Sequence, residues 1–492
     1  MGITTRHAVL AAGLLAAAVA APSIRNDFVA DDRWVIAERP FLKQPPSIVA
    51  VLTEPYWPVT FGGSMWRPAV IASYAADYRI SHSPHWFHAV NVVWTAVAAA
   101  LLALLACELA GPVVGLIAGL LFAVHPVHVE AIANVVGRAE LMAAAGYATA
   151  LLCALRAERR PIYLLGVALG AAFGMASKEL VATLPAAVVL VYAARRIAIR
   201  MAWKPAAAAA IVIVGYYILY AWVNAHAVLF AGGLAVGLEG LGIVQRTSAM
   251  VPISLEWWRL LLFPAHLSAD YSPGELLVST GLTAAHLLGA LVWAALGFVA
   301  WRTRRTIPGI AIGLAWFVIT MSPMANIVVP TEFLVAERTL YLPSFGIVFA
   351  LACALVAAPW PPRMRLGIVA VLVALGAARS IARIPSWHDD EQHYQALKRE
   401  APRSYRTLWL EGNDEFAAGR WGTGEQFLLQ SIALAPSVAG PRYDLARFYM
   451  KAKLWQPAIR QLEAVIAVDS GFAPAREALE EALHADASVR RR

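Results

Sequence analysis

The feature that most constrains this chain is a series of long apolar segments that recurs through residues 1–384. About 20 consecutive apolar residues cross the hydrocarbon core of a bilayer. The whole chain is 60% hydrophobic and only 15% charged, whereas roughly a quarter of an average soluble domain is charged. Since helices satisfy their backbone polar groups within lipid, the sequence predicts an all-α fold, a polytopic helical bundle in the membrane.

We expect about eleven spans from segment length and loop charge. They lie near residues 7–24, 85–107, 111–126, 139–156, 161–177, 180–194, 203–224, 279–301, 308–322, 339–358 and 364–383. Residues 250–267 are ambiguous, and we interpret them as lying on the bilayer surface or re-entering it. Ala18-Val19-Ala20 resembles a signal-peptidase site, so cleavage is an alternative to an uncleaved first helix.

The net charge of the chain is +8, and many of its arginines lie in short loops between the apolar segments. Cytoplasmic loops of membrane proteins carry an excess of arginine and lysine. We therefore expect a cytoplasmic N-terminus and an extracytoplasmic tail. Nucleic acid is not expected as a partner, because no basic stripe with interleaved aromatics is present. The cytoplasmic cations are Arg156, Arg159, Arg160, Arg195, Arg196, Arg200, Lys204, Arg302, Arg304, Arg305, Arg363 and Arg365.

Two regions flank or interrupt the apolar series. Residues 25–84 form the predicted first external loop, whose tryptophans and tyrosines suit short helices at the membrane interface. Residues 385–492 form a charged helical tail in which similar residues recur 34 positions apart, the period of tetratricopeptide (TPR) repeats. Two repeats are few for a free-standing array, so we expect this TPR-like domain to dock on the membrane domain 1–384 or on a partner. The matching pairs are Pro402 and Pro436, Gly412 and Ala446, Trp421 and Trp455, and Leu428 and Leu462.

Ionisable residues at membrane depth are costly and therefore mark functional candidates. In the predicted topology they gather on the extracytoplasmic side. A carboxylate there can accept a proton from a hydroxyl, and arginine or lysine can hold a phosphate leaving group. This combination suits transfer from a lipid-linked phosphate donor. The candidates are Asp31, Asp32, His125, His128, Glu130, Arg138, Glu140, Lys178, Glu179, Asp270, Glu332, Glu337 and Arg338.

Seven short motifs appear in an order that resembles a known family and cover most of residues 25–350. The chain resembles GT-C glycosyltransferases, and more specifically bacterial relatives of the transmembrane and tetratricopeptide-repeat protein O-mannosyltransferases. Asp31-Asp32 after the first span resembles the acidic motif of the GT-C first external loop. The motifs are Trp66-Arg67-Pro68, Phe87-His88 with Asn91, Leu121 to Glu130, Gly137-Arg138-Ala139-Glu140, Ser177-Lys178-Glu179, Leu267 to Ser272, and Glu337 to Ser344.

This resemblance implies a GT-C fold in the bacterial inner membrane. It implies inverting transfer of a sugar, expected to be mannose, from a polyprenyl-phosphate carrier to an extracytoplasmic hydroxyl acceptor, such as a protein serine or threonine. The general base would be Asp31 or Asp32, with Asp32 favoured. Membrane lipids, the donor and a protein or peptide acceptor would be the partners. Residues expected to bind the lipid phosphate or sugar are Arg138, Lys178, Arg338, Glu179, Glu140, His125, His128 and Glu130.

Each motif also has a structural interpretation. Asp31 and Asp32 suit a helix N-cap. His125, His128 and Glu130 suit either a divalent metal or hydrogen bonds at a helix end. The basic residues suit ion pairs with Glu140, Glu179 and Glu337, because buried charges are usually paired. No cofactor is predicted, and a divalent metal is kept as an alternative.

Two other functions stay open at this level. A lipid-linked sugar transporter or flippase would carry charges along a path through the bilayer, usually with inverted repeats. A membrane scaffold would recruit partners through its tail, although an anchor needs only one or two spans.

Overall fold

The computed structural model describes residues 2–44, 46–58, 65–223 and 234–490, and within them every regular element is a helix. The one β-type contact among these residues is an isolated bridge between Pro273 and Leu276. The predicted all-α fold is therefore confirmed. Residues 45 and 59–64, which belong to the predicted first external loop, lie outside the described residues.

Seven helical stretches among the described residues are long and apolar enough to cross a membrane. They contain the helices α1 (Thr5–Ala20), α5 (Pro84–Ala110), α8 (Arg138–Ala157), α11 (Trp203–Val223), α13 (Ala284–Thr303), α15 (Tyr341–Ala357) and α16 (Pro362–Arg383). Three shorter apolar stretches, at Tyr163–Met175, Glu179–Ala194 and Pro308–Met324, accompany them. The multi-pass membrane character is thus confirmed, and the count of eleven spans, which includes the short stretches, stays a prediction.

The predicted span at 111–126 is broken. Helix α6 (Pro112–Ala123) ends near His125, and the chain continues through Pro126–His128 into α7 (Val129–Ala133) after a bend of 54°. A proline at the start of the second piece disfavours helical backbone in the residue before it, which accounts for the break. After the bend, Glu130 in α7 contacts Arg338, which precedes α15.

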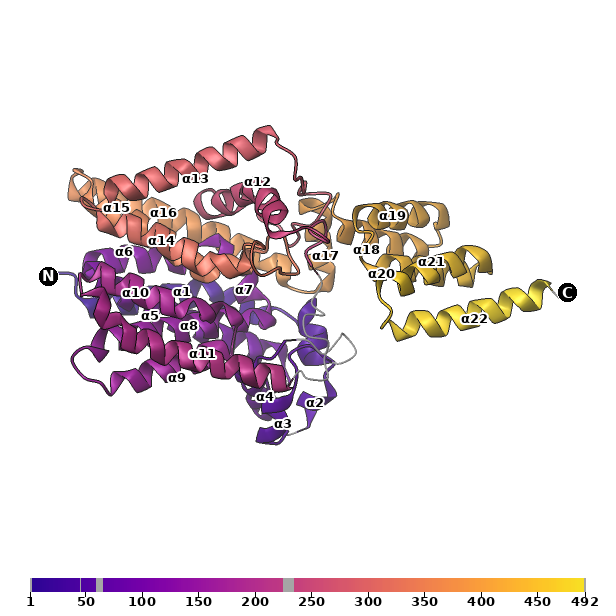
Figure 1. Cartoon of the computed structure of the whole chain (residues 1–492), viewed down its shortest axis with the longest axis horizontal. Coiled ribbons are helices and arrows are strands. Elements are labelled where there is room, and N and C mark those ends of the chain that lie inside the picture. The colour runs from indigo at the N-terminus through magenta and orange to yellow at the C-terminus, as the bar shows by residue number, and fades with distance from the viewer. Residues whose placement is uncertain (1, 45, 59–64, 224–233, 491–492) are drawn as a thin grey trace.

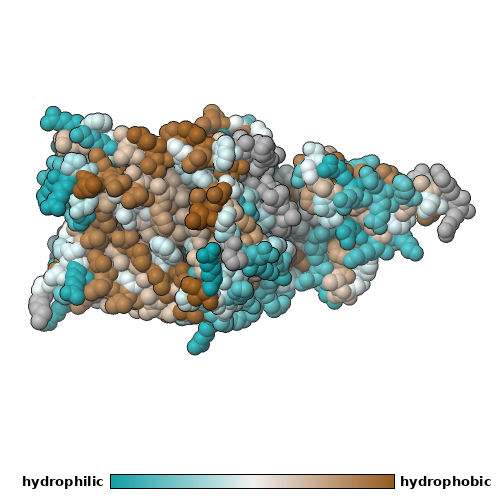
Figure 2. Space-filling model, turned by 90° about the horizontal axis from the view of Figure 1, so that it is seen from below, coloured by the Kyte–Doolittle hydropathy of each residue, from teal (hydrophilic) through white to brown (hydrophobic). Residues whose placement is uncertain are grey.

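All four arginine-rich connections lie at one end of the bundle. They join α8 to α9 (Tyr163–Met175), α10 (Leu184–Ala194) to α11, α13 to α14 (Pro308–Met321), and α15 to α16. Figure 1 shows them at the end where the N-terminus lies, whereas the tail leaves from the opposite end. Figure 2 shows a broad hydrophobic surface over the bundle and a hydrophilic tail. This arrangement fits a bundle immersed in lipid with its basic loops on one side.

Glycines allow two of the helix pairs to approach closely. A Cβ added to Gly146 of α8 would lie 2.8 Å from the carbonyl oxygen of Gly170 in α9. A Cβ added to Gly346 of α15 would lie 2.3 Å from the carbonyl oxygen of Gly313 in α14. Small residues at such crossings let membrane helices pack through van der Waals contact. These crossings fix the positions of helices whose ends carry charged residues.

The first external loop folds into short helices that cover the end of the bundle opposite the N-terminus (Figure 1). Its elements are a π-helical turn at Arg33–Ala37, α2 (Pro40–Lys43), α3 (Ile48–Thr53) and α4 (Pro68–Ile80). They share an apolar core with the start of α8 and α5, in which Val35, Tyr74 and Phe87 are fully buried. The short helices expected from sequence are present, and their position at the bilayer surface stays a prediction.

Helix α12 (Ile243–Leu262) covers most of the ambiguous segment 250–267. It is 20 residues long and contains Pro252, it is not among the helices apolar enough to cross a membrane, and it packs against α13. A surface or re-entrant position therefore stays our interpretation of this segment.

The tail consists of α17 (Asp390–Glu400), α18 (Tyr405–Ala417), α19 (Trp421–Leu434), α20 (Ala439–Lys451), α21 (Trp455–Val468) and α22 (Ala473–Arg490). Helices α18 and α19 form one hairpin, and α20 and α21 form a second that starts 34 residues later. Gly412 lies against Leu428 within the first hairpin. Tetratricopeptide character stays an interpretation of this geometry. The tail docks on the membrane domain: Tyr405 donates its backbone N–H to the carbonyl oxygen of Pro273, and Arg403 pairs with Glu275.

Candidate functional site

A cavity of about 550 Å³ opens at the end of the bundle opposite the N-terminus. Segments that are far apart in sequence form its wall. They are the segment from Asp31 to Val35, the residues before α4, the start of α8, the connection between α9 and α10, the last turns of α11, and residues 322–339. Its polar lining includes Asp31, Tyr56, Arg67, Glu140, Lys178, Glu179, Glu332 and Arg338.

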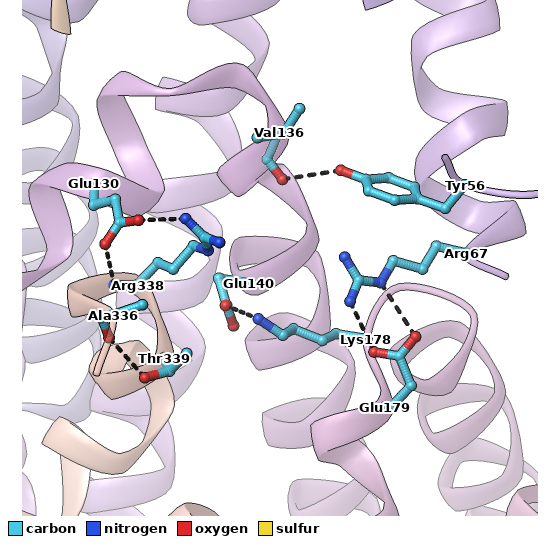
Figure 3. A network of polar contacts seen from close by, with 10 residues as sticks. All are labelled: Tyr56, Arg67, Glu130, Val136, Glu140, Lys178, Glu179, Ala336, Arg338 and Thr339. Carbon is cyan, nitrogen blue, oxygen red and sulfur yellow. Dashed lines mark hydrogen bonds and ion pairs between the residues drawn. The ribbon is translucent and has the colours of Figure 1, made fainter. Parts of the chain in front are cut away.

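Among the described residues, three cations face this cavity, and each is paired with a glutamate (Figure 3). Arg67 donates from Nε and Nη2 to the two carboxylate oxygens of Glu179, at 3.2 and 2.9 Å. The Lys178 ammonium contacts Glu140, and the Arg338 guanidinium contacts Glu130. The backbone N–H of Arg338 also donates to Glu130 at 2.8 Å. Pairing lowers the cost of keeping these charges away from water.

Helix ends explain where these side chains lie. Glu140 is in the first turn of α8, where the helix dipole favours a negative charge. Lys178 is extended between α9 and the 3-10 turn Glu179–Thr183, so its side chain points toward α8. Arg67 immediately precedes Pro68 at the start of α4. Because these ends meet at one level of the bundle, the charges form one group.

The surroundings shift the pKa values of Arg67 and Lys178 in opposite directions. Burial lowers the pKa of Arg67, but Glu179 and then Tyr56 outweigh this effect and raise the pKa overall. Burial lowers the pKa of Lys178 well below its usual range, and the neighbouring Arg67 and Arg338 act in the same direction. The Lys178 ammonium therefore depends on a negative partner, either Glu140 or a bound anion. Burial raises the pKa of Glu332, against the effect of Arg338 and Arg67.

The two neighbouring aspartates have different surroundings. Asp31 is half-buried and lines the cavity, and no hydrogen bond or ion pair joins its side chain to another described residue. Asp32 is fully buried and accepts backbone N–H groups from Val135 at 3.0 Å and Val136 at 2.7 Å. The geometry therefore favours Asp31 as the residue that can meet a substrate, whereas the sequence interpretation favoured Asp32. Asp32 instead ties the first loop to the turn before α8.

Arg138 lies away from the cavity. It is fully buried and paired with Asp77, and it donates to the side chain of Asn91 at 2.7 Å and to the carbonyl oxygen of Phe87 at 2.8 Å. These contacts join α8 to α4 and α5. The expected phosphate-binding role of Arg138 is not supported by this placement, and the ion-pair interpretation is.

The two histidines also lie outside the cavity wall. His125 bonds through Nε2 to the carbonyl oxygen of Leu261, and His128 bonds through Nε2 to the hydroxyl of Ser344. Glu130 turns toward Arg338 instead. Within the described part of the chain, no three His, Cys, Asp or Glu side chains are grouped so that they could hold a metal ion. The alternative of a metal at His125, His128 and Glu130 is therefore not supported.

The structure thus brings together six of the candidate residues on the cavity wall, namely Asp31, Glu140, Lys178, Glu179, Glu332 and Arg338. Glu130 does not line the cavity, and it forms an ion pair with Arg338. Arg67 is not among the site residues predicted from the sequence, although it belongs to the Trp66-Arg67-Pro68 motif. A cation directly before a helix-starting proline in the first external loop was the available signal.

One part of the cavity wall is apolar. Tyr217 of α11 lines it together with Met324, Val328 and Val329, which follow α14. Val328 and Val329 are also exposed, at 69% and 46%. The cavity therefore combines a charged interior with an apolar side, a combination that suits an amphiphilic ligand.

The chain is similar in sequence to proteins named protein O-mannosyl-transferases. It is 25% identical over 357 residues to Protein O-mannosyl-transferase F38B6.6 of Caenorhabditis elegans, which covers 67% of this chain and 48% of the relative. It is 24% identical over 475 residues to Protein O-mannosyl-transferase TMTC4 of Mus musculus, covering 83% of this chain and 64% of the relative. Over 139 residues it is 37% identical to Protein O-mannosyl-transferase Tmtc2 of Drosophila melanogaster, which corresponds to 27% of this chain and 15% of the relative.

The resemblance inferred from the motifs is confirmed by these names. The chain spans about half the length of the Caenorhabditis relative and less than two thirds of the other two. No family model matches the chain, and no solved structure is significantly similar to it.

Proposed function

We propose that this integral membrane protein is a mannosyltransferase that moves mannose from a polyprenyl-phosphate carrier to a serine or threonine hydroxyl of a protein. The observation that carries the proposal is the placement of Asp31 in the same cavity as Arg67, Lys178 and Arg338. The names of the relatives support the sugar and the type of acceptor. The phosphate-linked donor is supported by the three cations and by the apolar side of the cavity.

In this mechanism Asp31 acts as the general base. The acceptor hydroxyl attacks the anomeric carbon of mannose, its proton passes to the Asp31 carboxylate, and the bond from that carbon to the phosphate oxygen breaks. Attack opposite the leaving group inverts the anomeric centre. A carboxylate without a direct partner in the described structure remains available for this proton.

The cations act on the leaving group. The donor is a phosphodiester with one negative charge, and the released polyprenyl phosphate gains a second negative charge. Arg67, Lys178 and Arg338 hold that phosphate, and preformed cations stabilise a charge that grows in the transition state. The apolar wall near Val328 and Val329 accommodates the first isoprene units, so that the rest of the chain stays in lipid.

The side of the membrane follows from the basic loops. These loops lie at the end of the bundle opposite the cavity. The positive-inside rule places them in the cytoplasm. The cavity and the tail then face the extracytoplasmic side of a bacterial inner membrane, where an abundant nucleotide sugar is not available and a lipid-linked donor is.

The test is transfer by the purified full-length protein in lipid nanodiscs. Radiolabelled polyprenyl-phosphate mannose and a peptide with serines and threonines are the substrates. We expect transfer in the wild type and a loss of about 10²–10⁴-fold in kcat for Asp31→Asn, the usual range for a general base. Asp27→Asn is the matched control, since Asp27 is exposed in the same loop and does not line the cavity.

A wild-type rate in Asp31→Asn would show that Asp31 is not the base. Movement of the donor across sealed vesicles, without any transfer to peptide, would instead favour a flippase.

A further inference from the structure

The first helix of the tail contacts the segment that carries Asp31. Asp390, at the start of α17, accepts the backbone N–H of Ala30 on Oδ1 at 3.2 Å. Its Oδ2 accepts Nη1 of Arg33 at 2.6 Å. Beside them, the carbonyl oxygen of His388 accepts the backbone N–H of Asp27 at 2.7 Å. The tail therefore holds the chain on both sides of Asp31, across more than 350 residues of sequence.

The backbone at this point is strained. Ala30 has a φ of 51°, in the left-handed region that a residue with a Cβ adopts at a cost. Such a conformation persists only where the surrounding structure holds it in place. Asp32, two residues after Ala30, is held on the buried side by hydrogen bonds from the backbone N–H groups of Val135 and Val136. Asp31 therefore lies between an inner anchor at Asp32 and an outer anchor at Asp390.

We propose that Asp390 is a positioning residue for Asp31, so that docking of the tail completes the catalytic site. This inference rests on the proposed function. Asp390 acts through the hydrogen bond to Ala30, because an ion pair such as that with Arg33, whose two side chains are about half exposed, contributes little. Small displacements of a reacting group can reduce catalysis by about 10²-fold. The tail thereby gains a role in turnover in addition to any role in holding acceptors.

Four variants of the full-length protein separate the contacts. Asp390→Ala removes both bonds, whereas Asp390→Asn keeps one oxygen that can accept the N–H of Ala30. Arg33→Ala removes the ion pair alone. Asp389→Asn is the matched control, because it makes the same change of charge one residue away. Asn remains a good N-cap there, and the Asp389 side chain caps α17 by accepting the N–H of Gln392.

We expect kcat for mannose transfer to fall about 10-fold or more in Asp390→Ala. KM for the donor should change by less than about twofold, since the phosphate-binding cations are untouched. Asp390→Asn should restore most of kcat, and Arg33→Ala and Asp389→Asn should stay near the wild type. A parallel rise in KM and drop in melting temperature would show a general structural role and overturn the proposal.

Hydrogen–deuterium exchange provides a second readout that does not depend on activity. Asp390→Ala should raise exchange of the amides in residues 27–33, and Arg33→Ala should not. Unchanged exchange, or raised exchange with unchanged kcat, would overturn the proposal. If the wild type transfers no mannose, the proposed function fails by itself. The exchange measurement then still decides whether Asp390 holds this segment.

Discussion

Asp31 and Asp32 are adjacent in sequence, and we predict that their substitutions fail in different ways. Asp32→Ala removes the acceptor for the backbone N–H groups of Val135 and Val136, both of which are buried. Leaving a buried donor without an acceptor costs about 1–3 kcal/mol. Two such donors give a loss of about 2–6 kcal/mol in the free energy of unfolding. Asp31→Asn removes no hydrogen bond to another described residue and should leave stability unchanged.

The assay compares thermal unfolding and transfer for both variants in the same nanodiscs. For Asp32→Ala we expect the midpoint of unfolding to fall by about 3–10 °C, from the usual relation between stability and melting temperature. At a temperature where this variant is still folded, it should retain measurable transfer. Asp31→Asn should melt at the wild-type temperature and lose about 10²–10⁴-fold in kcat.

The reverse pattern would refute the reasoning. If Asp32→Ala melted at the wild-type temperature and lost transfer, while Asp31→Asn remained active, the base would be Asp32. The buried position of Asp32 would then have to open during turnover.

Three further predictions concern the cations. Arg138→Ala should lower the free energy of unfolding by about 3–5 kcal/mol, the usual cost of removing one partner of a buried pair. The folded variant should bind polyprenyl phosphate as well as the wild type. Thermal unfolding checks the first expectation, and lipid titration checks the second. Arg67→Lys keeps the charge, but Lys presents only a point charge and cannot make a two-point contact such as the one between Arg67 and Glu179. It should hold the donor phosphate less well for the same reason, so donor affinity should fall about 10-fold. Titration with a non-transferable donor analogue measures that change, and equal affinity would contradict it. Because burial lowers the pKa of Lys178, its ammonium loses its proton as pH rises, so wild-type donor affinity should weaken on the alkaline side. Lys178→Arg should hold its affinity to higher pH, and identical pH profiles would remove Lys178 from the phosphate site.

The membrane part of the fold follows from the sequence because lipid leaves few choices. Long apolar segments must be helices, and arginine-rich loops must share one side. The same logic predicted that Asp31, Glu140, Lys178 and Arg338 would meet at the opposite end of the bundle, where the structure places them. The break at His125 was not predicted, because the hydropathy of residues 111–126 is continuous and the bend depends on tertiary contacts.

The roles of individual charged residues were harder to predict. A sequence shows that Arg138 is an arginine near a helix start, but not that Asp77 and Asn91 enclose it. It shows two adjacent aspartates, but not which one turns inward. These outcomes depend on packing between segments that are tens of residues apart. The sequence alone does not determine which ionisable groups remain accessible in the folded chain.

Each cation that the described residues contribute to the cavity wall is paired with a glutamate, and this pairing affects catalysis. In the resting site Glu179, Glu140 and Glu130 already neutralise Arg67, Lys178 and Arg338. A donor phosphate with one negative charge must therefore compete with three carboxylates, which weakens its contacts with the cations. The leaving phosphate, with two negative charges, competes better for the same cations. Interactions that strengthen as the charge grows lower the barrier instead of tightening ground-state binding. Replacing Glu140 by Gln should therefore tighten donor binding and lower kcat, whereas a pure phosphate-binding trap would show tighter binding without loss of turnover.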